Sequence, residues 1–304
     1  MRSRAAFLAS VLACCRAGRD PPDSRHVVIA APDVPVPAPA PVSERAWPAE
    51  PVIALCEHAP DDMACVPGGS FVRGRDEDSH RCDQEGRPRM TAADTVPAAR
   101  VWLQTFYIDR HEVTVTAWRA CVRAGACRDV GPLYPDFQHP RQPITGVSWV
   151  DAVDFCRHAQ KHLPTEAQWE KAARGPDGEP FPWGRAPVDC TRAVIQDNHG
   201  RSCGVRNAWR LHPEIGRVLD VGSRPAGVYG LFDMVGNAEE WVYDWYSEDY
   251  ARCGARCLGD DPRGPCDGQS PCPGHRARAV RGGSWYWPGS HATGYHRRPH
   301  DPVN

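Results

Sequence analysis

The sequence has almost no net charge, no internal repeat and no hydrophobic run of membrane-spanning length. Its 36 basic and 38 acidic residues leave a formal charge of −2, which provides no long-range field to attract nucleic acid or anionic lipid. We therefore expect no nucleic-acid partner. The apolar stretch near the N-terminus, Ala5 to Ala13, is far shorter than the ~20 residues that cross a bilayer. Membrane association would therefore need a lipid anchor.

Cysteine, tryptophan and proline are abundant instead, at 14, 11 and 31 residues. Cytosolic thiols are kept reduced, so many cysteines among glycines and prolines favour an oxidising compartment. Arg2 and Arg4 precede the apolar stretch as in a signal peptide, and Val11-Leu12-Ala13-Cys14 resembles a bacterial lipobox. We expect a signal peptide over 1–14, acylation at Cys14, and a periplasmic or outer-membrane lipoprotein. The alternative is ordinary signal cleavage, with Cys14 and Cys15 lost or incidental.

Residues 15–55 are predicted to be a linker rich in proline and alanine. Prolines alternate with other residues from Pro35 to Pro41, which favours an extended polyproline conformation. Such a spacer would hold a folded domain, expected over 56–304, away from a membrane surface. The domain begins with a strand-turn-strand pattern, which is broken by the paired glycines Gly68 and Gly69.

Three helices are predicted from their capping residues. The first starts after Thr116 and ends before Gly125, and the second starts at Ser148, where Asp151 can act back on the helix start. The third starts at Thr165, which has capping-box spacing to Gln168, and ends by Gly175. On the second helix, Val150, Val153 and Ala159 are expected to share the buried side. After the third helix the sequence predicts loops and short strands.

Seven segments carry a joint resemblance to the formylglycine-generating enzyme, or sulfatase-modifying factor, family. They are, in order, Val66–Phe71 (VPGGSF), Phe106–Thr114 (FYIDRHEVT), Pro143–Trp149 (PITGVSW), Leu163–Gly175 (LPTEAQWEKAARG), Phe181–Gly184 (FPWG), Gly230–Trp241 (GLFDMVGNAEEW) and Val280–Trp285 (VRGGSW). The resemblance implies an α+β fold with little regular secondary structure, related to C-type lectin-like folds. Members continue to a Gly-Phe-Arg ending, whereas this chain stops at Asn304, so the domain is either naturally short or truncated.

The resemblance also implies an activity and its ligands. The family's oxidases bind copper(I) with two cysteines after Arg-Gly-Gly-Ser, and they convert the cysteine of a sulfatase Cys-x-Pro-x-Arg segment to formylglycine. The matching positions here are Trp287 and Ala292, which offer no thiolate for copper(I). We therefore expect no copper cofactor and no catalytic residue of that kind. The nearest upstream cysteines, Cys266 and Cys272, lie before the motif and not after it.

A structural calcium ion is a further implication of the resemblance. Asp233 and Glu240 would supply side-chain oxygens, and Gly236 and Ala238 would supply backbone carbonyls, which is a donor set that calcium prefers. The alternative is that these carboxylates are merely solvated or cap a helix. A second family calcium site looks degraded, because Val194 stands where an oxygen donor is expected.

The remaining cysteines are expected to form disulfides. Disulfides that close short loops are geometrically easy, which favours the pairs Cys121–Cys127 and Cys190–Cys203. Four further cysteines, with C-x3-C-x8-C-x5-C spacing, suit two disulfides better than a tetrahedral zinc site in an exported protein; they are Cys253, Cys257, Cys266 and Cys272. Cys156, on the second predicted helix, is expected to be an unpaired buried thiol.

His291, His296 and His300 could suggest non-haem iron, but they lie in a segment interrupted by glycine and proline. We expect them to be solvated surface residues. The tryptophans are expected to pack a loop-rich core. Together these inferences predict a member of the family that is not a copper oxidase and that binds a polypeptide or a cell-envelope component. Two alternatives remain, an enzyme of the superfamily that uses a different site and a lectin-like carbohydrate binder.

Overall fold

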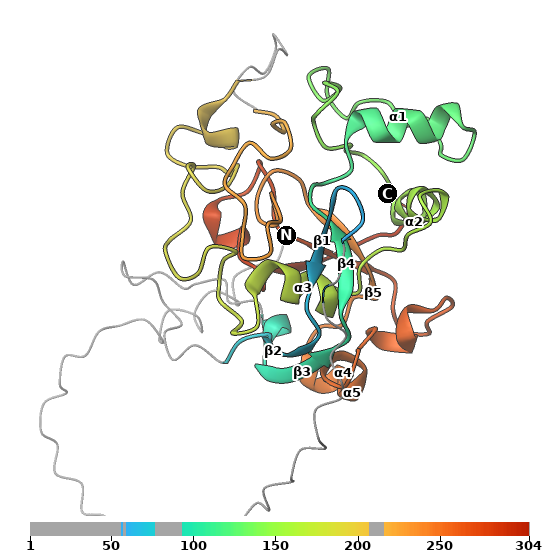
Figure 1. The fold of residues 1–304 in the computed structure, drawn as a ribbon, viewed down its shortest axis with the longest axis vertical. Coiled ribbons are helices and arrows are strands. Elements are labelled where there is room, and N and C mark those ends of the chain that lie inside the picture. Colours follow the sequence, from blue (N-terminus) through green and yellow to red (C-terminus); the bar gives the residue numbers. More distant parts are fainter. Residues whose placement is uncertain (1–55, 57–58, 77–92, 207–215, 304) are drawn as a thin grey trace, which may run out of the picture. The chain divides into compact units, whose positions relative to one another are not determined.

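Short helices and strands joined by long loops make up the structure, a computed structural model that describes residues 56, 59–76, 93–206 and 216–303 (Figure 1). The predicted signal peptide (1–14) and linker (15–55) lie outside the described residues. All described residues belong to one of the two units into which the chain divides. The predicted fold class, α+β with little regular secondary structure, is confirmed. In the described ranges, no helix has the length and apolar character needed to cross a membrane.

The strands form three small antiparallel sheets. In the first two, β1 (Met63–Val66) pairs with β4 (Phe106–Asp109), and β2 (Gly69–Arg73) pairs with β3 (Ala99–Leu103). The third sheet has the order β5-β6-β7 and an irregularity in β5 between Trp241 and Trp245. Its strands are β5 (Glu240–Trp245), β6 (Arg278–Arg281) and β7 (Arg297–His300). The strand-turn-strand prediction at the start of the domain is therefore confirmed.

The predicted capping boxes of two helices are confirmed. Ser148 and Asp151 cap α2 (Trp149–His158), and Thr165 and Gln168 cap α3 (Glu166–Arg174). In each box, the side chain of the N-cap residue accepts from the backbone amide of the third helical residue. The side chain of that third residue accepts in turn from the backbone amide of the N-cap residue.

The start of α1 (Val115–Arg123) was predicted two residues too late. Its N-cap is Thr114, whose side chain accepts a hydrogen bond from the amide of Ala117. The hydroxyl of Thr116 instead donates to the Pro140 carbonyl oxygen at 2.9 Å. The sequence prediction considered Thr116 alone as the cap, and the side chain of Thr116 is used in this tertiary contact instead.

The predicted apolar side of α2 is only partly buried, since Val153 and Ala159 are half-buried. Val150 is 47% exposed, whereas Asp151 is buried. The Asp151 carboxylate accepts from the Ser148 hydroxyl at 2.7 Å and pairs with Arg128 at 2.6 Å. Because this acid is fixed by the cap and by an arginine, the helix turns it inward and leaves the valine in solvent.

The short elements of the second half are mostly single turns. They comprise η2 (Arg201–Gly204), α4 (Tyr250–Cys253), α5 (Ala255–Leu258), η3 (Pro265–Gly268) and η4 (Gly289–His291), while η1 (Ala93–Thr95) lies earlier in the chain. Loops and short strands therefore follow α3, as predicted.

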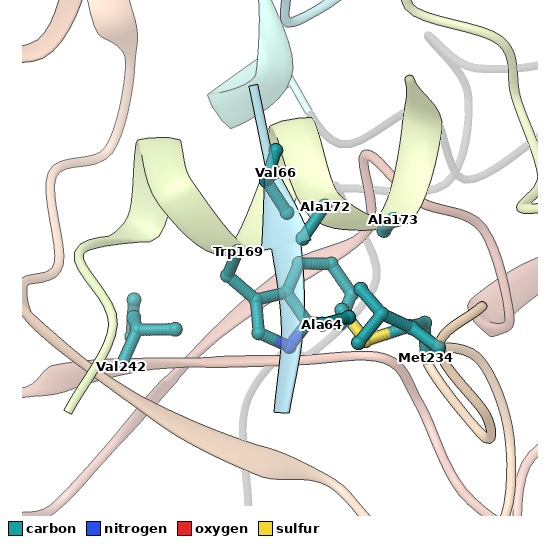
Figure 2. Packing of buried hydrophobic residues seen from close by; sticks show 9 residues of the cluster. Ala64, Val66, Trp169, Ala172, Ala173, Met234 and Val242 are labelled. Carbon is teal, nitrogen blue, oxygen red and sulfur yellow. The ribbon is translucent and has the colours of Figure 1, made fainter. Parts of the chain in front are cut away.

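Trp169 of α3 lies at the centre of the main hydrophobic core. Figure 2 shows its indole ring among Ala64, Ala172, Met234 and Val242. The side chain is fully buried, and burying an aromatic ring of this size stabilises a domain by a few kcal/mol. The expectation that tryptophans pack the core is confirmed at this position.

Beside this core lies a group of fully buried ion pairs, which we call the arginine–glutamate network. Its members are Arg73, Arg174, Arg281, Arg297, Glu166 and Glu170. Arg297 holds Glu166 with two bonds of 2.7 and 2.8 Å, and Arg281 holds Glu170 at 2.7 Å. The network ties α3 to β2, β6 and β7, so charge pairing joins elements that are too short to build a large core.

Candidate functional site

The loop from Asp233 to Glu240 carries an acidic side chain at each end, and Glu112 lies close enough for both charges to raise its pKa. We call Glu112, Asp233 and Glu240 the carboxylate cluster. The Asp233 carboxylate accepts from the amide of Gly222 at 2.6 Å. The Glu240 carboxylate accepts from the indole nitrogen of Trp169 at 3.0 Å. The cluster therefore lies directly against the hydrophobic core.

Glu112 was not identified as a site residue from the sequence, although it lies within a family segment. Its two carboxylate oxygens accept from the Ala238 amide at 2.8 Å and from the Asn237 side chain at 2.7 Å. Glu112 thus fixes the loop from 125 residues away in the chain. Its position in the FYIDRHEVT segment was the available signal, but spacing alone does not indicate that contact.

The backbone of this loop is tightly turned. Asp233, Gly236 and Asn237 all have positive φ, of 54°, 86° and 54°. A Cβ at Gly236 would lie 2.7 Å from the carbonyl oxygen of Val194, so glycine is required there. In the described part of the chain, no turn or side-chain hydrogen bond uses the carbonyl of Gly236 or Ala238 as an acceptor.

Burial dominates the electrostatics of the cluster, and the charge of Arg224 opposes it at Asp233. Burial raises the pKa of Glu240 to about 7, against a lowering hydrogen bond from Trp169. Burial also raises the pKa of Asp233 to about 6. The pKa of Glu112 is raised well above its usual value by burial and by the charges of Asp233 and Glu240. Among the described residues, no lysine or arginine forms an ion pair with any of the three.

The predicted calcium ligands are thus brought into one loop. Asp233 and Glu240 supply acidic oxygens, and Gly236 and Ala238 supply unused carbonyls, which is a donor set that suits calcium. Over the described ranges, no three His, Cys, Asp or Glu side chains converge closely enough to hold a metal ion. A cation at this loop would therefore depend on the carbonyls, and the calcium site stays a prediction.

The segment after Arg-Gly-Gly-Ser is aromatic and imidazole-rich. Trp287, at one of the two positions predicted to match the copper cysteines, stacks on His291 with ring centroids 5.1 Å apart. Ala292, at the other, is buried. The nitrogens Nδ1 of His291 and Nε2 of His296 are 3.2 Å apart. The expectation that these two histidines are solvated was wrong, because both are half-buried and contact each other.

The described cysteines are almost all paired. The predicted disulfides Cys121–Cys127 and Cys190–Cys203 are confirmed. The four later cysteines form Cys253–Cys257 and Cys266–Cys272, so the zinc alternative for them is wrong. A further disulfide joins Cys56 to Cys65.

Cys156 is the free cysteine of the described ranges, and it is half-buried on α2. Burial of the thiol raises its pKa to about 11, and the charge of Asp109 adds to this increase. It therefore carries little thiolate at neutral pH. No described pair of free thiols is present to bind copper(I), so the residues do not fit the family's copper centre.

A separate cavity of about 410 Å³ opens after α3. The rings of Phe181 and Trp183 stack in parallel on one another at 5.3 Å in its wall. Exposed Val228 and exposed Asp177 also line it. This volume lies within the usual range for small ligand sites. Sequence reasoning missed the cavity, because its lining comes from two segments about 50 residues apart.

The fold and these sites define a loop-rich α+β domain with a buried charge network, an acidic loop and an Arg-Gly-Gly-Ser strand. Residues 50–303 match the model of the family described as "Sulfatase-modifying factor enzyme 1-like domain". The chain belongs to this family.

Individual relatives agree with that assignment. The chain is 28% identical to the formylglycine-generating enzyme of Thermomonospora curvata over 284 residues, which covers 77% of this chain and 85% of that protein. It is 28% identical over 243 residues to a protein named serine/threonine-protein kinase pkn1 from Chlamydia caviae, of which it spans only 33%. Among solved structures, PvdO from Pseudomonas aeruginosa has the same fold, with a TM-score of 0.60 at 23% identity, covering 80% of this chain and 89% of that one.

Proposed function

We propose that this family member does not form formylglycine with copper and that it instead binds a polypeptide. The observation that carries the proposal is the pair Trp287 and Ala292 at the positions of the copper-binding cysteines. Copper(I) is held by thiolate sulfur, and Cys156 is the one free thiol of the described ranges. A family scaffold can host different functions, because activity resides in the site and not in the fold.

The cavity beside α3 supports the binding role. Its stacked aromatic pair offers a flat apolar surface, and Asp177 adds an exposed acid at the same cavity. A peptide side chain with an apolar stem and a cationic head, such as arginine or lysine, matches these groups through apolar contact, cation–π attraction and charge. A sugar would use the aromatic face alone, which makes carbohydrate binding the second outcome to be tested.

A synthetic Cys-x-Pro-x-Arg peptide tests both halves of the proposal. After aerobic incubation with copper-treated protein, we expect mass spectrometry to show no aldehyde above a protein-free control. Fluorescence anisotropy of the labelled peptide should show binding that weakens at least tenfold in Trp183→Ala. The matched control Leu133→Ala, which removes a side chain of a residue that is 57% exposed, should leave binding unchanged.

Each outcome of this experiment supports or overturns one half of the proposal. Aldehyde formation would restore the oxidase and overturn the first half. Absence of peptide binding, or equal binding by Trp183→Ala, would overturn the second half. Binding of a cell-wall polysaccharide that depends on Trp183, with no peptide binding, would establish the lectin-like alternative.

We also propose that the protein is exported and acylated at Cys14. The basic start, the short apolar stretch and the Val11-Leu12-Ala13-Cys14 sequence support this, as does the abundance of disulfides in a loop-rich domain. Intact-mass measurement of protein from the membrane fraction should show a lipid on an N-terminal Cys14. An unmodified N-terminus, or a chain that retains Met1 in the cytosol, would exclude the anchor.

Calcium is proposed as the cofactor that stabilises the acidic loop. Asp233 and Glu240 would hold it together with the carbonyls of Gly236 and Ala238. A bound divalent cation would remove the repulsion among three buried acids and supply a counter-charge, since no described lysine or arginine forms an ion pair with them.

A further inference from the structure

Two histidines that the proposed function does not use face each other near the end of the domain. His291 ends η4, and His296 directly precedes β7. Their rings are 4.7 Å apart between centroids and inclined at 71°. The Nδ1 atom of His291 and the Nε2 atom of His296 are 3.2 Å apart, so one ring donates its N–H to the lone pair of the other.

Both imidazoles are held in the neutral form that binds metals. Burial lowers the pKa of His296 to about 3, and the charges of His291, Arg281 and Arg298 contribute to the shift. Burial likewise lowers the pKa of His291. The two arginines are themselves paired with acids, Arg281 with Glu170 and Arg298 with Glu239, which offsets the positive charge that a cation would meet.

The spacing of the two nitrogens matches shared coordination. Two imidazole nitrogens that bind one metal ion at about 2.0–2.1 Å with a near-tetrahedral angle lie about 3.3 Å apart. The observed separation of 3.2 Å is close to this value, and each ring would turn so that its lone pair points to an ion beside the line between the two nitrogens. The ion would displace the proton that one ring now donates to the other.

The surrounding residues fix both rings. Trp287 stacks on His291 with an interplanar angle of 20°, and the His291 amide donates to the Pro288 carbonyl at 2.9 Å. The His296 amide donates to the hydroxyl of Thr293 at 3.1 Å. Ligands that are positioned before the metal arrives lose little freedom on binding, which favours affinity.

We propose that His291 and His296 form a two-imidazole site for a divalent transition-metal ion of borderline softness, such as zinc(II) or copper(II). Imidazole suits these ions. Within the described residues no third acidic, histidine or cysteine side chain completes the set, so water or a ligand group fills the remaining positions. A site with open positions is the arrangement in which a metal ion can also contact a bound molecule. The proposal is independent of the peptide-binding role and of calcium.

Zinc binding to the full-length protein tests the site. Protein stripped with chelator and then saturated with calcium should bind one equivalent of zinc in isothermal titration calorimetry. We expect His291→Ala and His296→Ala each to weaken binding at least tenfold. The control His158→Ala removes an exposed histidine on α2 and should leave the affinity unchanged.

A measurement on the unaltered protein guards against variants that fail to fold. Copper(II) added to one equivalent should give an electron paramagnetic resonance signal with hyperfine coupling to two imidazole nitrogens. No binding of either ion, a copper signal without nitrogen coupling, or zinc affinity that is the same in both histidine variants as in the unaltered protein would overturn the proposal.

Discussion

Two regions with buried carboxylates contact Trp169, and they differ in how the carboxylate charge is balanced. In the arginine–glutamate network, burial alone would raise the pKa of Glu166, but Arg297, Arg281 and Arg73 lower it to about 2. In the carboxylate cluster, burial raises the pKa of Glu240 to about 7 with no arginine to oppose it. Trp169 contacts both regions, with its ring 4.9 Å from the guanidinium of Arg281 and its indole nitrogen on Glu240.

The comparison shows that burial does not by itself decide the state of an acid. A buried carboxylate stays ionised when guanidinium groups supply both charge and hydrogen bonds. Without them it takes up a proton or requires a cation. Arginines of the same chain therefore balance the carboxylates of the network, whereas no described lysine or arginine forms an ion pair with those of the cluster.

The largest expected effect comes from breaking the network. Glu166→Gln leaves Arg297 without its anionic partner and leaves Arg73 with only its 3.9 Å ion pair to Glu170, and breaking a buried pair costs about 3–5 kcal/mol. Urea unfolding under oxidising conditions measures this loss. The same substitution at the exposed pair Glu248–Arg252, which is 3.2 Å apart, should have no measurable effect. A small loss at Glu166 would mean that the arginines find other partners.

The next effect concerns the cluster and calcium. Excess calcium should stabilise the protein by about 3 kcal/mol if its concentration exceeds the dissociation constant several hundredfold, so a chelator should lower the melting temperature by several degrees. Asp233→Asn combined with Glu240→Gln should abolish the difference. Asp154→Asn, which changes an exposed acid of α2, serves as the control. A melting temperature that is indifferent to chelator would exclude the calcium site.

A smaller effect is expected from pH. The folded-state pKa of Glu166, about 2, lies below its usual value of about 4.5. The stability that it contributes is therefore present above pH 4.5 and is lost as pH falls towards 2. The slope should be about 1.4 kcal/mol per pH unit for one proton. Unfolding curves across this range should show a shallower dependence in Glu166→Gln, and identical slopes would contradict the pairing.

The smallest effect is expected from Glu112→Gln in calcium-free protein. This change removes one of three neighbouring like charges but keeps the shape of the side chain, so relief of repulsion offsets the altered hydrogen bonds to Asn237 and Ala238. We expect the free energy of unfolding to change by less than about 1 kcal/mol. A loss as large as that of Glu166→Gln would indicate that the cluster is charge-balanced after all.

Local sequence signals predicted a substantial part of the fold. The capping boxes at Ser148 and Thr165 each involve residues three positions apart, so their geometry is contained in the sequence. The disulfides Cys121–Cys127 and Cys190–Cys203 close short loops and could be predicted for the same reason. The start of α1 was predicted at Thr116 instead of Thr114, because the contact of Thr116 with Pro140 is not visible in the local sequence.

The candidate site was predicted only in part. The family segments identified Asp233, Gly236, Ala238 and Glu240, which follow one another in a single loop. Glu112 was missed, because its contact with that loop spans more than a hundred residues. The histidine pair was misjudged, because whether His296 is exposed depends on how the segment before β7 packs.

The sequence by itself therefore determined the family, the helix starts that depend on near neighbours, and the absence of cysteine at 287 and 292. These follow from residue identity and short spacing. The tertiary structure decided which acids are paired with arginine, which are left without a cation, and which histidines meet. Those outcomes depend on distances between segments far apart in the chain, and at the short range of a buried ion pair a difference of a few ångströms changes the balance between desolvation and attraction.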